Sequence, residues 1–418
     1  MPAFVFPGQG SQRPGMGRPW TDHPSWELVV DASEATGRDL AHLLLDAGHE
    51  ELTETRNAQL ATVTMSLLVL DAVERVGIEP TAVAGHSVGE YTALIAAAAL
   101  GFEDGLRVVA ERGEAMQAAA DGEPGVMLLV SGTDRDTVAV ACSLAEGDVW
   151  VANYNSPDET VIAGQPEAVE KAGQWALKLG ARRLAPVAAG GAFHTPYMRS
   201  ARSRLRKALS TASFHAPEVP VVANVDARAH TGSVEWTLLL SAQLSSPVRW
   251  HQTITSLGAS GERLFVELGA GSSLSGMVRT CLDHAETVGV SSPDDLDRLV
   301  DAVVGDEKLH ALTAGHHGEH LYVSERVVVS PGAGIFSPTG GIADPESAPL
   351  VDEPSVLTDA LSPLSYGAGE PAVEVGTLLG TVSGSEVRSP FAGHLMGMLA
   401  HAGERVQAGQ PIAWLRAS

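Results

Sequence analysis

The chain has 418 residues, of which 44% are hydrophobic and 19% charged, so it can build two or three domains with buried cores. Its formal net charge of −24 argues against a nucleic-acid partner, because the phosphate backbone repels an acidic protein. The two cysteines, Cys142 and Cys281, give no disulfide framework, and no segment reaches the roughly 18 apolar residues of a membrane span. The first residues lack the basic and apolar regions of a secretory signal. We therefore expect a cytoplasmic protein that binds no membrane.

The N-terminal segment predicts a strand followed by helices. Residues 3–6 form a short apolar strand, which the loop Pro-Gly-Gln-Gly-Ser-Gln at 7–12 closes. The glycines let this loop approach a ligand, so that backbone N–H groups and the Gln9 side chain could meet a bound acyl group. A tight turn at a strand end would have the same sequence. Apolar residues then recur at helical spacing over 25–48 and 59–76.

Residues 82–100 predict a nucleophile elbow. An apolar strand at 82–84 is followed by Gly85-His-Ser87-Val-Gly89 and then by a helical pattern. The sharp turn holds the serine in a strained backbone, and the glycines let neighbouring segments approach without a Cβ clash. The helix N-terminus then presents N–H groups beside the hydroxyl. Small residues also gather at such joins for packing reasons alone.

The middle of the chain predicts a small inserted unit. A helix at 102–120 contains Arg112, which in isolation is typical of a solvated surface charge. Residues 124–188 then show the strand and helix order βαββαβ. The polar strand end at 153–157, Asn-Tyr-Asn-Ser-Pro, is suited either to binding a ligand or to an Asx-turn.

A second group of polar residues follows this unit. His194, in the glycine-rich loop 190–195, is the best candidate for a base acting on Ser87, although a capped loop histidine is the alternative. The next helix has Arg199, Arg202 and Arg206 on one face, the strongest local concentration of positive charge. Strands are predicted at 221–226 and 264–269, with a loop and a helix between them.

A polar linker is predicted at 306–320. It contains His316-His-Gly-Glu-His320, a formal match to the H-x-x-E-H zinc pattern. That pattern requires a regular helix, and Gly315 and Gly318 argue against one. We therefore predict no metal site.

Residues 1–305 resemble the malonyl-CoA:acyl-carrier-protein transacylases and the acyltransferase domains of polyketide synthases. The resemblance rests on separated motifs in a fixed order, and the ordered set is far more specific than any one of them. They are Phe6-Pro-Gly-Gln-Gly-Ser-Gln12, Gly85-His-Ser-Val-Gly-Glu90, Arg112-Gly113, Asn153-Tyr-Asn-Ser-Pro157, Ala192-Phe-His194, Asn224-Val-Asp-Ala227 and Gln243-Leu-Ser-Ser-Pro-Val248.

The resemblance implies an α/β-hydrolase-like domain at 1–305 with a ferredoxin-like insertion at 124–188. It implies that Ser87 is acylated, with His194 as general base and then general acid. It also implies that the backbone carbonyl of Gln243 orients His194 and that the N–H groups of Gln9 and Val88 form the oxyanion hole.

The resemblance further implies the residues that bind substrate. Arg112 pairs bidentately with the free carboxylate of a malonyl group, which distinguishes such an enzyme from a monocarboxylic transacylase or an esterase. His86 and Asn155 are the other expected substrate-binding residues. Phe193 resembles the malonyl-selecting form, because relatives that select methylmalonyl carry Ser there; the phenyl ring fills the space of an α-methyl group.

The implied reaction is a ping-pong transfer of malonyl from coenzyme A to Ser87 and then to the phosphopantetheine thiol of an acyl carrier protein, in fatty acid or polyketide biosynthesis. The prosthetic group belongs to the partner, so no covalently bound cofactor is expected. Carrier proteins are usually acidic, so we predict that Arg199, Arg202 and Arg206 form their dock. A solvated helix face is the alternative.

Residues 321–418 resemble a biotinyl/lipoyl-carrier domain, an all-β barrel-sandwich. Two similar halves begin at Arg326 and Val387, and a Pro/Ser/Glu-rich insertion at about 338–370 separates them. Biotin and lipoate are attached through lysine, yet the hairpin reads Val382-Ser-Gly-Ser-Glu-Val387 and no lysine follows Lys308. We interpret this domain as a carrier that bears no prosthetic group, kept for docking, oligomerisation or stability; its partner could be a synthase or carboxylase subunit.

Two other functions stay open. An editing hydrolase on the same fold would release acyl groups to water, but it has no need of Arg112. A scaffold that docks a synthase or carboxylase complex rests on the tail alone and leaves the acylation motifs unexplained.

Overall fold

The computed structural model describes residues 2–303, 325–331, 334–339, 372–389, 393–398, 400, 405–406 and 411–416. Contacts divide the chain into two compact units, Met1–Gly315 and His316–Ser418. The predicted linker at 306–320, with its histidine-rich motif, lies outside the described residues. So does most of the insertion predicted at 338–370.

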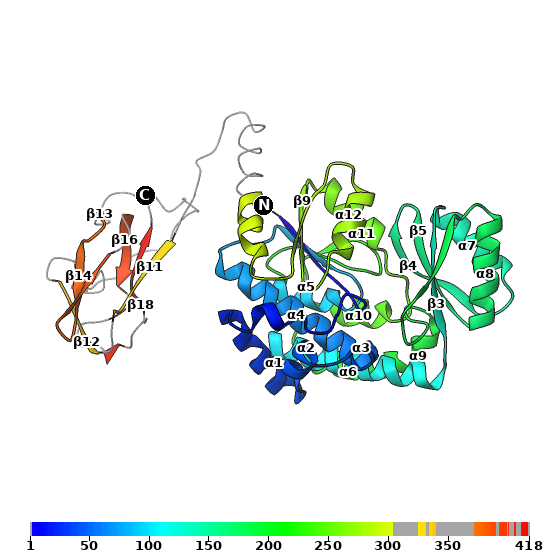
Figure 1. The fold of residues 1–418 in the computed structure, drawn as a ribbon, viewed down its shortest axis with the longest axis horizontal. Coiled ribbons are helices and arrows are strands. Elements are labelled where there is room, and N and C mark those ends of the chain that lie inside the picture. The colour runs from blue at the N-terminus through cyan, green and yellow to red at the C-terminus, as the bar shows by residue number, and fades with distance from the viewer. Residues whose placement is uncertain are drawn as a thin grey trace, which may run out of the picture. The chain divides into compact units, whose positions relative to one another are not determined.

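A six-stranded sheet forms the centre of the first unit (Figure 1), in the order β10-β9-β1-β2-β7-β8. The strands from β10 to β7 are parallel, and β8 pairs antiparallel with β7. Their bounds are β1 Ala3–Phe6, β2 Ala82–Gly85, β7 Val221–Val222, β8 Ala229–His230, β9 Leu264–Leu268 and β10 Glu286–Val290. The predicted α/β class is thus confirmed for this unit.

Helices cover both faces of this sheet because successive side chains of a strand point to opposite faces. Phe4 and Phe6 belong to a core that includes α4, α5 and α6, whereas Ala3 and Val5 pack with α11 and α12. Outside the inserted part, the helices of this unit include α1 Glu27–Thr36, α2 Leu40–Leu45, α3 His49–Thr53, α4 Thr55–Arg75, α5 Gly89–Ala96, α6 Phe102–Gly122, α9 Arg199–Leu209, α10 Trp236–Gln243, α11 Trp250–Ala259 and α12 Ser273–Cys281. Among the described residues, no helix is long and apolar enough to cross a membrane.

Two helical segments differ from the sequence prediction in their bounds. The pattern at 25–48 is divided between α1 and α2, because α1 ends at Gly37 in the left-handed conformation, with φ 64°. The helix predicted from residue 59 begins at Thr55, so its first turn includes polar residues that the apolar periodicity missed.

The inserted unit lies between α6 and α9 and has its own core. Its four strands pair antiparallel in the order β4-β5-β3-β6, with α7 and α8 packed against each other and the sheet (Figure 1), which is the predicted βαββαβ arrangement. The backbone N–H of Tyr154 donates to the carbonyl of Val248 at 2.8 Å and ties the unit to the larger domain. Its elements are β3 Val126–Ser131, α7 Arg135–Leu144, β4 Val149–Ser156, β5 Glu159–Gly164, α8 Pro166–Lys178 and β6 Arg183–Val187.

The described part of the second unit consists of strands in two four-stranded sheets, β11-β18-β16-β13 and β15-β14-β12-β17. Apolar side chains such as Phe336, Leu379 and Ile412 form a shared core. The strands are β11 Glu325–Val329, β12 Gly334–Pro338, β13 Ala372–Val373, β14 Leu378–Val382, β15 Ser385–Arg388, β16 Gly393–Met398, β17 Arg405–Val406 and β18 Pro411–Arg416.

The strand-to-helix turn after β2 depends on two glycines. A Cβ on Gly85 would lie 1.9 Å from the backbone carbonyl of Gly89, and a Cβ on Gly89 would lie 2.3 Å from the carbonyl oxygen of Phe6. Both clashes involve backbone atoms, which cannot move without opening the turn. The elbow therefore requires glycine at these positions for steric reasons.

We expect the substitution Gly85→Ala to lower the free energy of unfolding by about 3 kcal/mol or more, because the new methyl overlaps fixed backbone. Gly101→Ala is the matched control, since Gly101 has φ −64° and a Cβ there would meet nothing within 4 Å. Urea unfolding of both variants measures the difference. Equal stability of the two would contradict the steric explanation.

Candidate active site

Ser87 lies at the turn between β2 and α5 in the left-handed region, with φ 53°. Such a backbone is strained for a residue with a Cβ and persists only where neighbours hold it. Two contacts do so: Ser87 N donates to Asn224 Oδ1 at 2.8 Å, and the Ser87 carbonyl accepts from Gln243 Nε2 at 2.8 Å. The turn thus fixes the direction of the hydroxyl.

His194 faces this hydroxyl from the loop before α9. Its Nε2 lies 2.8 Å from Ser87 Oγ, and its Nδ1 lies 2.9 Å from the backbone carbonyl of Gln243. A carbonyl only accepts, so Nδ1 carries the proton and Nε2 is left free to accept from Ser87. This is the serine–histidine pair, with a carbonyl in place of a carboxylate, that the family resemblance implied.

The imidazole of His194 is held neutral by its surroundings. Burial lowers its pKa to about 3, and the positive charge of Arg112 acts in the same direction. A neutral histidine with a free Nε2 is the form that a general base requires.

Arg112 on α6 lies beside the same hydroxyl and is fully buried. Its Nη2 donates to Gln243 Oε1 at 2.9 Å and to Ser87 Oγ at 3.2 Å, and its Nη1 donates to Gln59 Oε1 at 2.6 Å. The guanidinium also lies 5.6 Å from the ring centre of Tyr91. All four partners are neutral, so no carboxylate occupies the side of the guanidinium that faces Ser87; the charge of Glu90 acts on Arg112 without a direct hydrogen bond.

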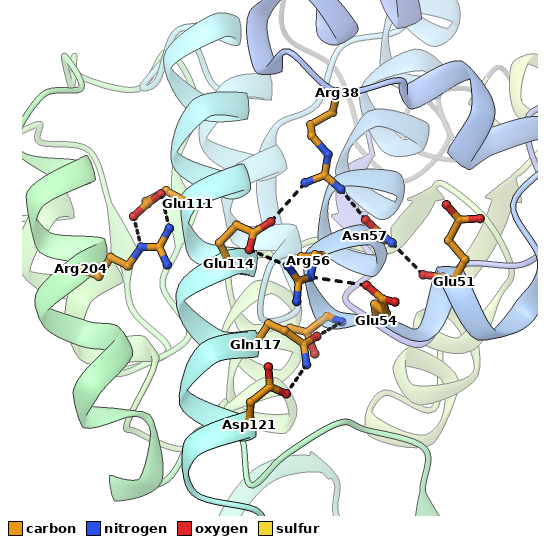
Figure 2. Close-up of polar contacts among 11 residues, drawn as sticks. Arg38, Glu51, Glu54, Arg56, Asn57, Glu111, Glu114, Gln117, Asp121 and Arg204 are labelled. Atoms are coloured by element: carbon orange, nitrogen blue, oxygen red, sulfur yellow. Dashed lines mark hydrogen bonds and ion pairs between the residues drawn. The ribbon is translucent and has the colours of Figure 1, made fainter.

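A polar network on the outer side of α6 fixes the helix beside α4 (Figure 2). Glu114 binds Arg38 at 3.3 Å and Arg56 at 3.1 Å, and Gly113 lets α6 approach the backbone of Arg56 closely. Arg38 also donates to Asn57 on α4. These contacts lie directly after Arg112 in the sequence and hold its helix in register with Gln59.

The loop after β1 covers the elbow. A Cβ on Gly8 would lie 2.5 Å from the carbonyl of His86, so the loop packs directly on this turn. Within the part of the chain that the structure describes, the N–H groups of Gln9 and Val88 donate to no protein acceptor. Two free N–H groups at these positions are what an oxyanion hole needs.

The other predicted substrate residues lie around this centre. Phe193, directly before His194, is buried in the main core. His86 Nε2 lies 3.4 Å from Asn155 Oδ1, and burial lowers the His86 pKa to about 4. Asn155 also donates to Glu159 at 3.0 Å. The structure thus pairs His86 with Asn155, across the boundary between the two parts of the first unit.

A cavity of about 360 Å³ reaches His194 from the inserted unit. Its walls are mostly apolar, with residues of α7 and β4 on one side and of the segment after α10 on the other. They are Ala139, Cys142, Val149, Trp150, Val151, Tyr154, His194, Pro196, Ser245 and Pro247.

The predicted basic surface is on α9. Arg199, Arg202 and Arg206 are exposed, and none of them forms an ion pair with another described residue. Arg202 donates to Ser241 at 3.1 Å. Arg204, which points elsewhere on the helix, pairs with Glu111 (Figure 2).

The sequence analysis missed three residues that hold the site together. Gln59, Glu90 and Asn224 are all buried and make contacts to Arg112, Gln243 and Ser87. Gln59 is a polar residue within an apolar helical run, which is a detectable signal, and Glu90 and Asn224 were noted only as parts of motifs. Among the described residues, no group of three or more His, Cys, Asp or Glu side chains could hold a metal.

Comparison with known proteins identifies relatives of the first unit. A family model described as "Acyl transferase domain" matches residues 3–313. The malonyl CoA-acyl carrier protein transacylase of Bacillus subtilis (strain 168) is 38% identical over 303 residues, which cover 71% of this chain and 96% of the relative.

Two solved structures are similar to the same region. The acyl carrier protein S-malonyltransferase of Vibrio cholerae is 36% identical with a TM-score of 0.68, covering 71% of this chain and 99% of that one. A malonyl-transacylase in complex with a type II PKS acyl-carrier protein is 34% identical with a TM-score of 0.69, covering 72% and 99%. The chain belongs to the acyl transferase family, with curated malonyl CoA-acyl carrier protein transacylases among its relatives.

Proposed function

We propose that this protein transfers a malonyl group from malonyl-CoA to the phosphopantetheine thiol of an acyl carrier protein. The observation that carries the proposal is the buried guanidinium of Arg112, 3.2 Å from a serine hydroxyl that also lies 2.8 Å from a neutral histidine. The base His194 and the cation that would bind the substrate carboxylate, Arg112, thus both lie within hydrogen-bonding distance of the nucleophile, the Ser87 hydroxyl. The relatives named above support the same activity.

In the first half-reaction, Ser87 Oγ attacks the thioester carbonyl while its proton moves to His194 Nε2. The carbonyl oxygen becomes an oxyanion, which the N–H groups of Gln9 and Val88 stabilise. The C–S bond then breaks, and the leaving sulfur takes the proton from His194. The product is a malonyl ester of Ser87 and free coenzyme A.

In the second half-reaction, the carrier protein's thiol replaces coenzyme A and the steps run in reverse. His194 accepts the thiol proton, the sulfur attacks the ester carbonyl, and Ser87 recovers its proton as the C–O bond breaks. The apolar lining of the cavity beside His194 supports entry of the pantetheine arm there.

Selection of malonyl over acetyl follows from charge and shape. The carboxylate of malonyl can pair bidentately with Arg112, whereas acetyl leaves that buried charge unpaired. The ring of Phe193, buried beside His194, supports exclusion of an α-methyl group by its volume. An editing hydrolase has no use for this arginine, so the transferase is the better account.

The acyl carrier protein is the proposed partner, and Arg199, Arg202 and Arg206 are its proposed dock. The solved complex of a related transacylase with its carrier protein supports the partner class. Exposed cations without ion pairs along α9, the helix that follows His194, support the location. Fatty acid and polyketide pathways both use such a transfer, and the site is equally suited to either.

We propose that the second unit is a barrel-sandwich related to biotinyl/lipoyl carriers but without a prosthetic group. In its two similar halves, β11 corresponds to β15 and β12 to β16. β11 and β16 lie in one sheet and β12 and β15 in the other, so corresponding strands exchange sheets, as an internal two-fold axis requires. The hairpin between β14 and β15 closes through Ser383 and Gly384, both with positive φ, and offers no lysine. The role proposed for this unit is docking to a synthase or carboxylase subunit.

The central test is radiolabelling with malonyl-CoA. Ser87→Ala should abolish the covalent adduct, because no oxygen remains to be acylated. Arg112→Ala should lower malonyl transfer by roughly 100-fold or more and shift selectivity toward acetyl, since the carboxylate loses its partner. Adduct formation that survives Ser87→Ala would disprove the proposal, and unchanged selectivity in Arg112→Ala would disprove the malonyl assignment.

Reversing the charge of Arg202 and Arg206 together, to Glu, should raise the apparent KM for an acidic carrier protein about tenfold at low salt. Self-acylation by malonyl-CoA should be unchanged, because coenzyme A does not use the dock. Arg75→Glu on α4 is the control for net charge, since Arg75 pairs with Asp71 away from α9. Equal effects on self-acylation and on carrier-protein KM would contradict this docking site.

His194 should make the protein less stable in acid. Its pKa falls from 6.5 to about 3 on burial, so below pH 6.5 the unfolded chain binds a proton that the folded protein does not. Between pH 7 and pH 5, wild type should therefore lose about 2 kcal/mol more free energy of unfolding than His194→Gln. Urea unfolding at the two pH values measures this, and identical losses would contradict a neutral buried His194.

A further inference from the structure

Glu90 is a buried carboxylate that the acyl-transfer steps leave unused. It lies on the first turn of α5, three residues after Ser87, and only 1% of its surface is exposed. Burial raises its pKa to about 7. A group so costly to bury is expected to have structural or functional partners.

Both oxygens of Glu90 have donors. Oε1 accepts the backbone N–H of Asn224 at 3.1 Å, and Oε2 accepts from Gln243 Nε2. Asn224 in turn holds the elbow, because its side chain binds Ser87 N at 2.8 Å and the Gly85 carbonyl at 2.7 Å. The Glu90 side chain is therefore linked to Ser87 through Asn224 and to Arg112 through Gln243.

The contacts of Gln243 define which way its amide points. Its Nε2 faces oxygen atoms of Glu90 and Ser87, and its Oε1 faces Arg112 at 2.9 Å. The reversed amide would place oxygen against oxygen and an NH₂ group against a guanidinium. Both oxygens of Glu90 face N–H donors, which is the hydrogen-bonding pattern of the ionised form. As an acceptor, Glu90 favours the Gln243 orientation that leaves Oε1 for Arg112.

We propose that Glu90 is a positioning residue that determines malonyl selectivity, by fixing the Gln243 amide that in turn holds Arg112. This inference rests on the proposed function. Glu90 touches neither the substrate nor the reacting atoms; it acts through Gln243, and Gln243 acts through Arg112.

The two roles of Gln243 make this proposal separable from general damage to the site. Its backbone carbonyl orients His194 at 2.9 Å, whereas its side chain contacts Arg112 and the backbone carbonyl of Ser87. A change at Glu90 disturbs the side chain and leaves the Gln243 carbonyl in place. The Ser87 turn keeps its second support, the hydrogen bond from Ser87 N to Asn224, so acyl groups that need only Ser87 and His194, such as acetyl, should be affected less than malonyl.

The test is Glu90→Gln, which keeps the shape and introduces an NH₂ group. The backbone N–H of Asn224 is fixed, so the new amide keeps its oxygen on that side and its NH₂ group meets Gln243 Nε2, donor against donor. We expect kcat/KM for malonyl-CoA to fall roughly 10- to 100-fold, as for a misplaced binding group, and that for acetyl-CoA to change less than about threefold. Glu90→Asp, which restores the acceptor, should recover part of the malonyl preference.

Glu267→Gln is the matched control. Glu267 on β9 is also fully buried, and it accepts hydrogen bonds from Leu274 N, Ser275 N and Ser275 Oγ, away from Arg112 and Gln243. It undergoes the same chemical change, so it reports what loss of a buried carboxylate does to the protein as a whole. Its ratio of malonyl to acetyl kcat/KM should equal that of wild type.

A double-mutant cycle decides whether Glu90 acts through Arg112. In an Arg112→Ala background, Glu90→Gln should change malonyl transfer less than about twofold, because the group it positions is absent. An unchanged ratio in Glu90→Gln, or full additivity in the cycle, would overturn the inference.

Two further measurements keep the result interpretable. If Glu90→Gln does not fold, Gln243→Met removes the same amide while keeping the backbone carbonyl, and it should cause the same loss of malonyl preference; retained preference would overturn the inference. Wild type that forms no malonyl adduct would instead count against the proposed function, so the two failures are distinguishable.

Discussion

The site depends on the complete burial of one guanidinium. Removing Arg112 from water costs several kcal/mol, and a carboxylate in direct contact would offset this cost but would also occupy the place of the substrate. The fold instead surrounds Arg112 with neutral acceptors and an aromatic face: Gln59, Gln243, Ser87 and Tyr91. Both terminal nitrogens of the guanidinium have hydrogen-bond acceptors, and the carboxylate of Glu90 acts on its charge only from behind Gln243. That combination makes an anion site that is stable when empty and still attractive to a carboxylate.

This arrangement explains why the site is assembled from distant segments. Ser87 belongs to the turn after β2, Arg112 to α6, His194 to the loop after the inserted unit, and Gln243 to the end of α10. The elbow provides only the strained hydroxyl, and each other group needs its own rigid support. The network of Glu114 on α6 shows such a support, since it binds α6 to the segment that presents Gln59 (Figure 2). The inserted unit lies between Arg112 and His194 in sequence, and its Tyr154 N–H binds the Val248 carbonyl in the segment that follows Gln243.

The sequence predicted the parts of the site that local chemistry specifies. The glycines around Ser87 reveal the elbow because backbone clashes exclude any Cβ at Gly85, and the motif order located His194, Arg112 and the Gln243 carbonyl. It did not reveal the break of the first helical segment at Gly37, since apolar periodicity continues across it. Nor did it reveal that Gln59 binds Arg112 or that Glu90 binds Gln243, because packing between segments far apart in the chain brings these pairs together. The direction in which a glutamine amide points cannot be predicted from the sequence either.

The separation of roles within Gln243 has a consequence for how such a site can change. Its main-chain carbonyl, which any residue at that position supplies, orients His194, whereas its side-chain amide contacts both Arg112 and the Ser87 carbonyl. Asn224 divides its contacts the other way round: its side chain holds the elbow, and its backbone N–H binds Glu90. A fold of this kind can alter the acyl group it accepts by side-chain substitution behind Arg112, while the serine, the histidine and the backbone that orients them stay as they are. Because those supporting side chains are buried and linked by hydrogen bonds, a single substitution among them leaves a buried polar group without a partner and is costly. A change of specificity therefore requires a second substitution that restores the lost hydrogen bond.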